Sequence, residues 1–260
     1  MIQEKHFFEF AAETGLTKHF GSNDATDQLV TLCQIDADSC VLDVGCGVGA
    51  TPCYLAETVG CRVVGVDILP KMVERSKERA EKLGLTGRLN FRVADAQDLP
   101  FEDERFDAVI TESVTSFPED KQQAVNEYAR VLKPGGCVGL NESTWLKVPP
   151  PPELVAWVRQ DVGAAVMPQT AAGWQNLLVT AGLQDIHTTI LEVDVKDEGR
   201  GILQRYGLGG MLTMIARAFR LYLRNPHYRQ FVKEVNQGGI IPEGFRDTFG
   251  YGIYVGRKPA

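Results

Sequence analysis

The sequence contains no long apolar run and no general excess of positive charge. No segment approaches the roughly 18 uninterrupted apolar residues of a membrane span. Met1 to Phe10 mix charged side chains with aromatic ones and lack the apolar core of a signal peptide. The formal charge of −7 argues against general nucleic-acid binding, which needs a clustered basic face. We therefore expect a cytoplasmic protein with no nucleic-acid partner.

Paired cysteine spacings are also missing. The cysteines form no CxxC pair with partner histidines, so the sequence predicts no zinc site and no other metal centre. Without a secretory signal a disulfide framework is not expected, and most of the thiols should be buried as small apolar groups. The cysteines are Cys33, Cys40, Cys46, Cys53, Cys61 and Cys137.

The stretch from residue 39 to residue 141 alternates short apolar segments with helix-like ones. This alternation predicts a parallel sheet that is covered by helices on both faces. Ligands of such sheets bind beyond the carboxyl ends of the strands. We expect strands at 39–44, 62–66, 89–93, 106–110 and 137–141, and helices at 51–59, 70–83 and 121–132.

The pattern changes after Asn141. Pro149 to Pro152 predict a stiff, extended connector. Beyond them, residues 201–237 look helical with an interruption at Asn225-Pro226. Further helices are expected at 153–163 and 171–181, and further strands at 183–195 and 251–257.

A glycine-rich turn follows the first expected strand, in the string Val41 to Gly49. Where a strand turns into a helix beneath a bulky ligand, side chains would block the approach of that ligand. Gly45, Gly47 and Ala50 also fit the dinucleotide-binding pattern, in which a pyrophosphate meets a helix N-terminus. Asp43 favours another ligand, because a carboxylate opposes a pyrophosphate and suits a cationic amino group.

The string Asp43-x-Gly45-x-Gly47-x-Gly49 resembles the glycine loop of the class I (Rossmann-like) methyltransferases that depend on S-adenosylmethionine (SAM). The resemblance is to the small-molecule type and includes the methyltransferases of quinone biosynthesis. It implies that the loop lies under the methionine part of SAM. The cofactor contacts implied for this loop are Asp43, Gly45, Cys46, Gly47 and Gly49, with the Cys46 thiol interpreted as buried packing.

Further segments match the same family in order. Asp67 ends the second expected strand, where the family's carboxylate accepts hydrogen bonds from both ribose hydroxyls. Asp67 would also suit a nicotinamide dinucleotide, or could cap the helix that follows. Ile68 is implied to pack on the adenine face, and Asp95 and Ala96 to bind the adenine amino group and ring, although Asp95 could be a simple turn residue. Thr111 is implied to lie beside the sulfonium and the acceptor.

The resemblance covers residues 36–141 well and includes the helix stop at Val131 to Gly136. It extends more weakly upstream to His19-Phe20-Gly21. The implied fold is α/β: a Rossmann-like, doubly wound, seven-stranded and mostly parallel sheet, with the last strand antiparallel and a helical cap. The implied organisation is an N-terminal helical lid at 1–35 and a methyltransferase domain at 36–260, with a helical acceptor-cap insertion at about 200–245.

Methyl transfer from a sulfonium mainly requires alignment and exclusion of water, and needs a general base only where the acceptor must lose a proton. Glu112 and Glu142 at strand ends, and His19 in the lid segment, are the candidate catalytic residues. As alternatives, Glu142 could be a solvent-exposed residue at the rim, and His19 could only cap or pack.

The acceptor should be selected by the late elements, namely the region of Trp145 and the helices around Trp157 and Trp174. The insertion interleaves apolar residues with basic ones such as Arg220 and Arg224. It fits a flexible apolar lid for a lipophilic acceptor, with arginines on an anionic group or a membrane surface. An ordinary amphipathic cap or dimer helix is the simpler interpretation.

The sequence therefore predicts a SAM-dependent methyltransferase that acts on a small organic acceptor, lipophilic in one interpretation. A nicotinamide-dependent oxidoreductase is the first alternative, and Asp43 argues against it. A non-catalytic SAM-binding protein is the second. No transmembrane segment is expected, whereas peripheral membrane contact and a homodimer are both compatible with the sequence.

Overall fold

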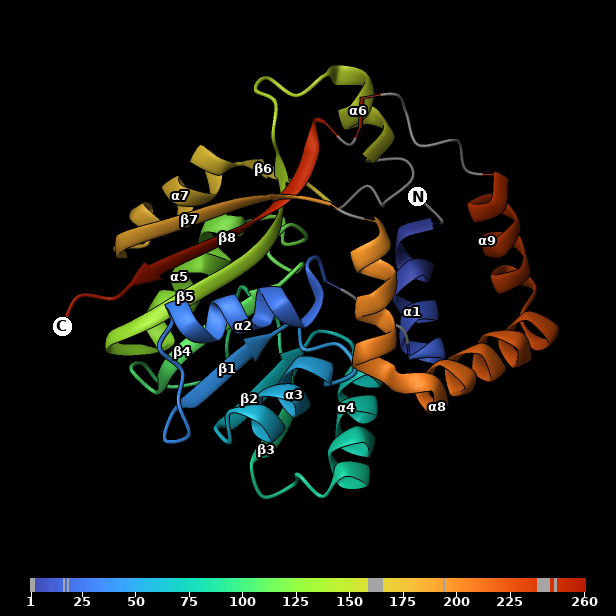
Figure 1. Ribbon diagram of the computed structural model, residues 1–260, viewed down its shortest axis with the longest axis horizontal. Helices are drawn as coiled ribbons and strands as arrows, with labels where there is room; N and C mark the ends of the chain where they lie inside the picture. The colour runs from blue at the N-terminus through green and yellow to red at the C-terminus, as the bar shows by residue number, and fades with distance from the viewer. Residues whose placement is uncertain are drawn as a thin grey trace.

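A twisted β-sheet forms the middle layer of the protein (Figure 1). The computed structural model describes residues 3–15, 17, 19–158, 166–193, 195–237, 244–245 and 247–260. The strands are β1 (Cys40–Val44), β2 (Arg62–Asp67), β3 (Leu89–Val93), β4 (Phe106–Glu112), β5 (Leu132–Trp145), β6 (Gln169–Thr170), β7 (Gln184–Glu192) and β8 (Phe249–Arg257). The helices are α1 (Gln3–Thr14), α2 (Ser22–Leu32), α3 (Ala50–Thr58), α4 (Pro70–Leu83), α5 (Lys121–Val131), α6 (Pro152–Trp157), α7 (Ala171–Thr180), α8 (Val195–Arg224) and α9 (Pro226–Gln237).

The strand order β3-β2-β1-β4-β5-β8-β7 confirms the doubly wound, mostly parallel sheet. β1 to β5 pair in parallel, and β8 lies antiparallel between β5 and β7, as expected for the last strand. The two-residue β6, which pairs with Thr144 and Trp145 of β5, is an addition to the seven strands expected. Val195, expected in a strand, instead begins α8. Residues 159–163 of the helix expected at 153–163 lie outside the described residues.

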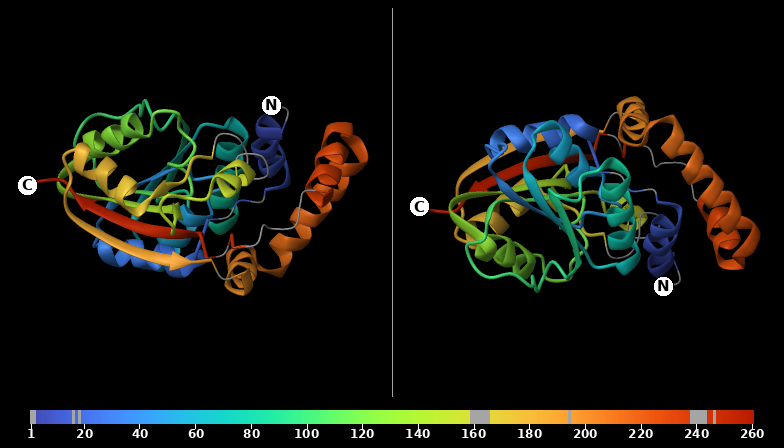
Figure 2. Two further views of the ribbon diagram at one scale, coloured as in Figure 1. Left: turned by 90° about the horizontal axis from the view of Figure 1, so that it is seen from above. Right: turned by 90° about the horizontal axis from the view of Figure 1, so that it is seen from below.

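Alternate residues along each strand divide between two apolar clusters, one on each face of the sheet. Val41 and Ile110 point into the cluster covered by α2, α3 and α4, and Leu42 and Val109 into the cluster covered by α5 and α7. Figure 2 shows this helix–sheet–helix layering from two sides. Because a parallel sheet is buried on both faces, its strands carry few polar residues before their carboxyl ends.

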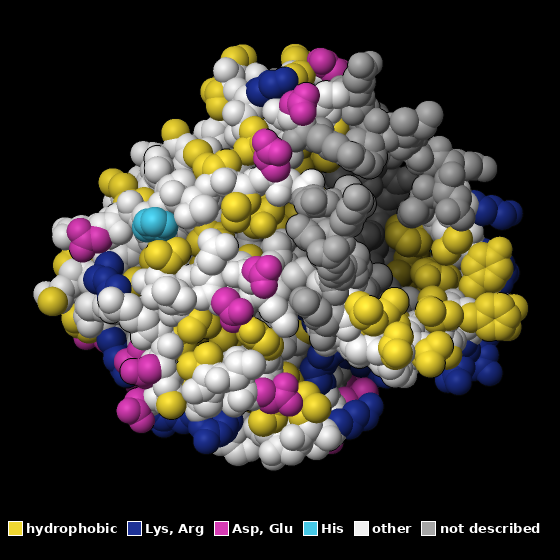
Figure 3. All heavy atoms as spheres, in the orientation of Figure 1, with side chains coloured by type: hydrophobic (Ala, Val, Ile, Leu, Met, Phe, Trp, Pro, Cys, Tyr) yellow, Lys and Arg dark blue, Asp and Glu magenta, His cyan; other side chains and the backbone are white. Residues whose placement is uncertain are grey.

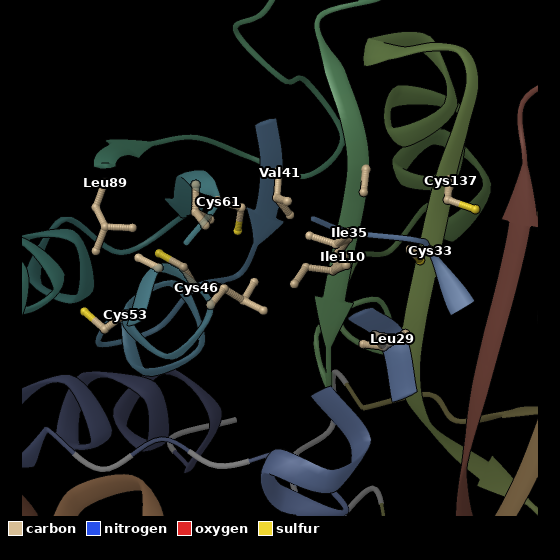
Figure 4. Packing of buried hydrophobic residues seen from close by; sticks show 14 of the residues in the cluster. Leu29, Cys33, Ile35, Val41, Cys46, Cys53, Cys61, Leu89, Ile110 and Cys137 are labelled. Atoms are coloured by element: carbon tan, nitrogen blue, oxygen red, sulfur yellow. The ribbon is translucent and has the colours of Figure 1, made fainter. Parts of the chain in front are cut away.

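The cysteines support the expectation of buried thiols. All six are free, and all except the half-buried Cys40 are buried. Figure 4 shows Cys33, Cys46, Cys53, Cys61 and Cys137 among the aliphatic side chains of the first cluster.

A helical cap of α1, α8 and α9 lies at the side of the sheet away from the C-terminus (Figures 1 and 2). α8 packs against α1 and α2, and α9 packs against α1. The approach of α8 to α2 is close at Gly201, where a Cβ would collide with the Oγ of Ser22. α8 then bends at Gly207, whose φ of 61° and ψ of 174° are not helical. The helix break expected at Asn225-Pro226 separates α8 from α9.

None of the helices in the described part of the chain combines the length and the apolar character needed to cross a bilayer. α2, which belongs to the segment expected as a lid, covers β5 and β8. Within the described residues, the part of the segment 1–35 that lies near the strand ends is therefore α1 together with residues 15, 17 and 19–21.

Candidate active site

The carboxyl ends of four strands bring the predicted residues to one edge of the sheet. Val44 of β1 lies opposite both Val66 of β2 and Thr111 of β4, and Glu112 lies opposite Asn141 of β5. The parallel arrangement places everything that follows these positions at the same rim.

The glycine turn after β1 is closely packed by the neighbouring loops. Gly45 has a φ of 75°, and a Cβ there would collide with the side chain of Val114. Gly47 has a φ of 54°, and a Cβ there would lie 3.0 Å from Cγ2 of Thr17. Both glycines adopt the left-handed conformation that other residues rarely take. The backbone of the turn therefore carries no side chain at Gly45 or Gly47. It lies between the loop after β4 and the lead-in to α2.

Asp43 of β1 is buried, and one oxygen of its carboxylate is unpaired within the described residues. Its side chain is 2% exposed, and its Oδ2 has no hydrogen-bond partner among the described residues. Burial raises the pKa of Asp43 well above its usual range, and the charges of Glu112 and Asp67 add to this, while Arg205 opposes it. An unpaired buried carboxylate is costly, so this atom is suited to a cationic ligand group.

Asp67 joins the end of β2 to the glycine turn. Its Oδ2 accepts from the Gly47 amide at 2.9 Å and its Oδ1 accepts from the Leu69 amide at 2.9 Å. Burial raises the pKa of Asp67 to about 6, although these two hydrogen bonds oppose the shift. A carboxylate has about four accepting positions, so each oxygen can still accept a ligand hydroxyl.

The residues implied for adenine lie at the outer side of the same rim. Ile68 is 63% exposed, directly after β2. Asp95 accepts from the Gln97 amide at 2.9 Å through Oδ1, which makes it a turn-forming residue as well as a candidate ligand contact. Ala96, next to it, is half-buried. An apolar surface beside a carboxylate is thereby formed after β2 and β3.

Glu112 and His19 form a buried polar pair at the end of β4. Glu112 accepts from Thr26 Oγ1 at 2.9 Å and from Thr51 Oγ1 at 2.7 Å. His19 Nε2 lies 3.2 Å from Glu112 Oε2, but the two atoms do not meet the geometry of a hydrogen bond. Nε2 has no hydrogen-bond partner among the described residues.

Burial lowers the pKa of His19 to about 4, with a further contribution from Arg205, and this outweighs the opposing effects of Glu112 and the Phe20 carbonyl. The imidazole is therefore neutral near pH 7. The lowered pKa of His19 indicates a neutral imidazole, whereas the 3.2 Å distance to Glu112 Oε2 suggests an ion pair. We favour the neutral form, since the loss of solvation on burial outweighs the attraction of Glu112 for a charged imidazole. Nδ1, 3.0 Å from the Phe20 carbonyl, is then the nitrogen that carries the proton.

Glu142 is buried within the protein rather than exposed at its rim. Its carboxylate accepts from the amides of Val114 at 2.9 Å, Thr115 at 2.6 Å and Ser116 at 3.2 Å, and from Ser116 Oγ at 2.9 Å. Burial raises the pKa of Glu142, although these hydrogen bonds oppose the shift. Thr111 is fully buried beside it, with Oγ1 2.9 Å from Thr115 Oγ1. The arrangement orders the loop after β4.

Several site residues were not singled out from the sequence. The Tyr206 hydroxyl of α8 contacts the backbone and side chain of Thr17 above the glycine turn. Asn141 Nδ2 donates to the Phe20 carbonyl at 2.8 Å, and its Oδ1 is buried with no partner among the described residues. Arg205 was also missed, although its charge acts on both Asp43 and His19. The run of polar residues from Asn141 to Thr144 was a signal that the sequence offered for Asn141.

A third apolar cluster lies beyond the end of β5, next to this polar group. Phe245 contacts Trp157 with ring centroids 4.9 Å apart and stacks on Phe249 at 4.7 Å. Phe117 of the loop after β4 packs against this cluster and contacts Phe8 of α1 at 4.9 Å. Of the three tryptophans expected near the acceptor, Trp145 and Trp157 belong to this cluster.

Trp174 is a core residue rather than part of the third apolar cluster. It is fully buried on the α5–α7 face of the sheet, and its Nε1 donates to the Ser143 carbonyl at 3.0 Å. α7 packs against β7 and β8, and the expected contact between this helix and the acceptor stays a prediction. A surface depression lined by Asp36, Asp107 and Lys133 is remote from the site, at the amino ends of the strands.

No group of three or more His, Cys, Asp or Glu side chains suited to a metal ion occurs within the described residues. The site instead offers a bare glycine turn, an unpaired carboxylate at Asp43 and a carboxylate with free accepting positions at Asp67. Together with the doubly wound sheet, these features define an α/β protein that binds a nucleoside bearing a cationic group.

Comparison with known proteins identifies the family. Residues 42–140 match the model of the methyltransferase domain. An uncharacterized protein of Haemophilus influenzae is 31% identical over 234 residues, covering 89% of this chain and 92% of that protein. The 27-O-demethylrifamycin SV methyltransferase of Amycolatopsis mediterranei is 36% identical over 163 residues, covering 61% of this chain and 59% of the relative.

Among solved structures, the [4+2]-cyclase SpnF shares the fold with a TM-score of 0.76 and 20% identity, covering 98% of this chain and 94% of that one. The chain belongs to the SAM-dependent methyltransferases of class I. SAM is its cofactor, and the nicotinamide-dependent oxidoreductase is not supported. The unpaired Oδ2 of Asp43 and the bare glycine turn fit this cofactor.

Proposed function

We propose that this methyltransferase methylates a hydroxyl oxygen of a small lipophilic acceptor, with His19 taking the proton that the acceptor loses. The observation that carries the proposal is the position of His19 Nε2, which lies 3.2 Å from Glu112 Oε2 next to the third apolar cluster and has no hydrogen-bond partner among the described residues. A non-catalytic SAM-binding protein would have no need of such a pair.

The proposed cofactor contacts follow the strand ends. Asp43 Oδ2 would accept from the amino group of SAM, and the two oxygens of Asp67 from the ribose hydroxyls. Ile68, Asp95 and Ala96 would surround the adenine. The bare backbone of Gly45, Cys46, Gly47 and Gly49 would support the methionine part, and Thr111 would act by holding the loop that faces the sulfonium.

Bound SAM supplies a methyl group on a positively charged sulfur. An oxygen that receives a methyl group becomes strongly acidic, so a weak base is enough to remove its proton. His19, whose pKa is about 4, is neutral and can accept that proton on Nε2 while Nδ1 donates to the Phe20 carbonyl. The resulting imidazolium would lie 3.2 Å from Glu112 Oε2, which would stabilise its charge.

The proposed role of Glu142 is positioning. Three amides and a hydroxyl from residues 114–116 already occupy its carboxylate, and it is fully buried. Glu142 thereby fixes the loop that carries Phe117 toward the aromatic cluster.

A lipophilic acceptor is supported by the third apolar cluster. Trp157 and Phe245 are half-buried there, and Trp157 Nε1 has no partner among the described residues. An acceptor with an apolar body and one oxygen would pack against these two rings and accept a hydrogen bond from Trp157 Nε1. The Amycolatopsis relative is named for methylating the 27-oxygen of a rifamycin, which supports oxygen as the accepting atom, and a hydroxylated quinone precursor would have the same chemistry.

The finer expectations about setting and organisation are part of the proposal. Six free cysteines are compatible with a reducing compartment such as the cytoplasm. The lid role is proposed for residues 1–21, and the acceptor-cap role for residues 200–237, while 238–243 lie outside the described residues. A homodimer through the cap helices is the competing interpretation.

The test has two stages. Calorimetric titration should show binding of SAM and S-adenosylhomocysteine but not of NADH, and Asp67→Ala should weaken the adenosyl ligands. A panel of lipophilic alcohols and phenols is then screened for formation of S-adenosylhomocysteine. With a positive acceptor, His19→Gln should lower kcat about 10²- to 10⁴-fold at an unchanged Kd for S-adenosylhomocysteine.

His187, an exposed histidine on β7, provides the matched control, since His187→Gln should leave kcat unchanged. An unchanged kcat in His19→Gln would refute the role of His19. Turnover with thiols or amines, but with no hydroxylated compound, would refute oxygen as the accepting atom.

A further inference from the structure

The outer face of α8 carries a continuous apolar stripe. Its members follow one another at intervals of three or four residues beyond the bend at Gly207, so they lie on one side of the helix. Each is between 61% and 74% exposed. The stripe consists of Leu208, Leu212, Ile215, Phe219 and Leu223.

The stripe is not the face that attaches α8 to the protein. α8 packs against α1, α2 and α9, and its Tyr206 hydrogen-bonds to Thr17, while Met211 and Leu221 on other sides of the helix are half-buried. Arg217 lies on the inner side too, since a Cβ at Gly15 would meet its Nη1 at 2.8 Å. Within the described part of the chain, the stripe therefore faces solvent.

Such a gathering of exposed apolar side chains is unusual for this protein. Other large exposed apolar residues, such as Leu83, Val179 and Ile190, belong to different elements. In Figure 3 the apolar side chains form a dense patch in the region where Figure 1 draws α8, with Lys and Arg side chains along its border. Large contiguous apolar patches of this kind mark interaction sites.

The charge of the surrounding segment indicates what covers the stripe. Residues 201–237 contain six Lys or Arg and one acidic residue, Glu234, in a chain of net charge −7. Arg220 and Arg224 are exposed, and each directly follows a member of the stripe. Arg229 Nη1 donates to the carbonyls of Tyr222 at 2.9 Å and Leu223 at 3.0 Å, which places a third cation at the end of the stripe.

We propose that α8 docks on an anionic membrane surface, with its apolar stripe in the boundary between headgroups and acyl chains and its arginines at the lipid phosphates. An apolar face bordered by basic residues is the pattern of helices that lie in the plane of a membrane. The basic border matches the negative surface potential of anionic lipids. This inference does not depend on the proposed acceptor chemistry.

A second copy of the chain is the competing occupant. In a two-fold symmetric dimer the same patch of both copies is buried, so the basic residues Arg220, Arg224 and Arg229 would face another basic segment. Like charges in such an interface oppose association. Negative lipid headgroups would instead attract the same three arginines electrostatically.

The test is cosedimentation with vesicles of phosphatidylcholine alone and of phosphatidylcholine with one quarter phosphatidylglycerol, on the full chain. We expect binding to the anionic vesicles that weakens with salt, and little binding to the neutral ones. Ile215→Gln/Phe219→Gln should lower the affinity about tenfold or more. Arg220→Gln/Arg224→Gln should remove most of the preference for anionic vesicles.

Val179→Gln provides the matched control, since Val179 is an apolar residue on α7 with 57% exposure, and it should bind like the wild type. Calorimetric titration with S-adenosylhomocysteine verifies that each variant is folded. Absence of vesicle binding, or binding that Ile215→Gln/Phe219→Gln leaves unchanged, would overturn the proposal. A dimer in light scattering that this double variant dissociates, without vesicle binding, would assign the stripe to a second copy. Methyl-transfer activity is a separate readout, so either proposal can fail alone.

Discussion

The hydroxyl of Tyr206 accepts a hydrogen bond from the Thr17 amide at 2.9 Å and donates to the Thr17 carbonyl at 2.6 Å. Tyr206 also packs against the buried cluster of Ala12, Val48 and Met72. One side chain of the cap thus holds the lead-in to α2 directly above Gly47. The helical cap and the glycine turn are coupled through this contact.

Tyr206→Phe should increase the Kd for SAM about three- to tenfold, because it removes hydrogen bonds worth about 1 kcal/mol that hold Thr17 over the cofactor site. The aromatic packing is kept, so the melting temperature should change little. Calorimetric titration measures the effect. Tyr222→Phe, on the outer part of α8, is the control and should bind SAM normally. Equal affinity in both variants would contradict a coupling between cap and glycine turn.

The affinity for SAM should fall as the pH falls through about 6. Burial raises the pKa of Asp67 to about 6, and the protonated form loses an acceptor that the ribose hydroxyls need. If only the ionised form binds well, the Kd at pH 5 should be about tenfold higher than at pH 7. His19, with a pKa of about 4, stays neutral over this range.

Asp67→Asn separates this effect from that of Asp43, whose pKa is also raised by burial. The variant should bind SAM more weakly at pH 7 and lose most of the dependence on pH. Titrations at half-unit intervals between pH 5 and 7.5 provide the measurement. Superimposable pH profiles in wild type and Asp67→Asn would assign the titration to another group.

Glu142→Gln should destabilise the protein more than Glu112→Gln. Glu142 accepts from backbone amides that can only donate, so the amide nitrogen of glutamine would face donors and leave them unpaired, at a cost of about 1–3 kcal/mol. Glu112 accepts from the hydroxyls of Thr26 and Thr51, which can rotate and accept instead. Urea unfolding of both variants tests the order, and equal losses would contradict it.

Gly45→Ala should lower the free energy of unfolding by about 1–3 kcal/mol, because its Cβ collides with Val114 and its φ is unfavourable for alanine. Val114→Ala in the same chain should recover part of the loss, which a double-mutant cycle in urea measures. Additive effects would mean that the cost comes from the backbone conformation alone.

The strand ends and the glycine turn were predictable because the alternation of apolar and polar residues is local. The position of Asp43 two residues before Gly45 was enough to predict a cationic ligand group, and the structure places that carboxylate with an unpartnered oxygen. The family comparison confirmed the methyltransferase. The roles of individual site residues stay predictions.

Contacts between distant segments could not be predicted in the same way. Tyr206 and Thr17 are 189 residues apart, and no local pattern relates them. The candidate base Glu142 was recognised from its place in a strand, but its partners come from residues 114–116 of another loop. The burial of Trp174 in the core of the α5–α7 face was not predicted, because an apolar helix in a cap and one on a sheet look alike in sequence.

The position of β8 between β5 and β7 determines when the sheet can be completed during synthesis. β7 pairs with β8 and reaches the rest of the sheet only through it, within the strand order that the structure describes. During synthesis, therefore, β5 and β7 each present an unpaired edge until residues 249–257 have left the ribosome. The unpaired edges expose the nascent chain to aggregation in this interval, although the glycine turn and the strand ends around it come from residues before Trp145.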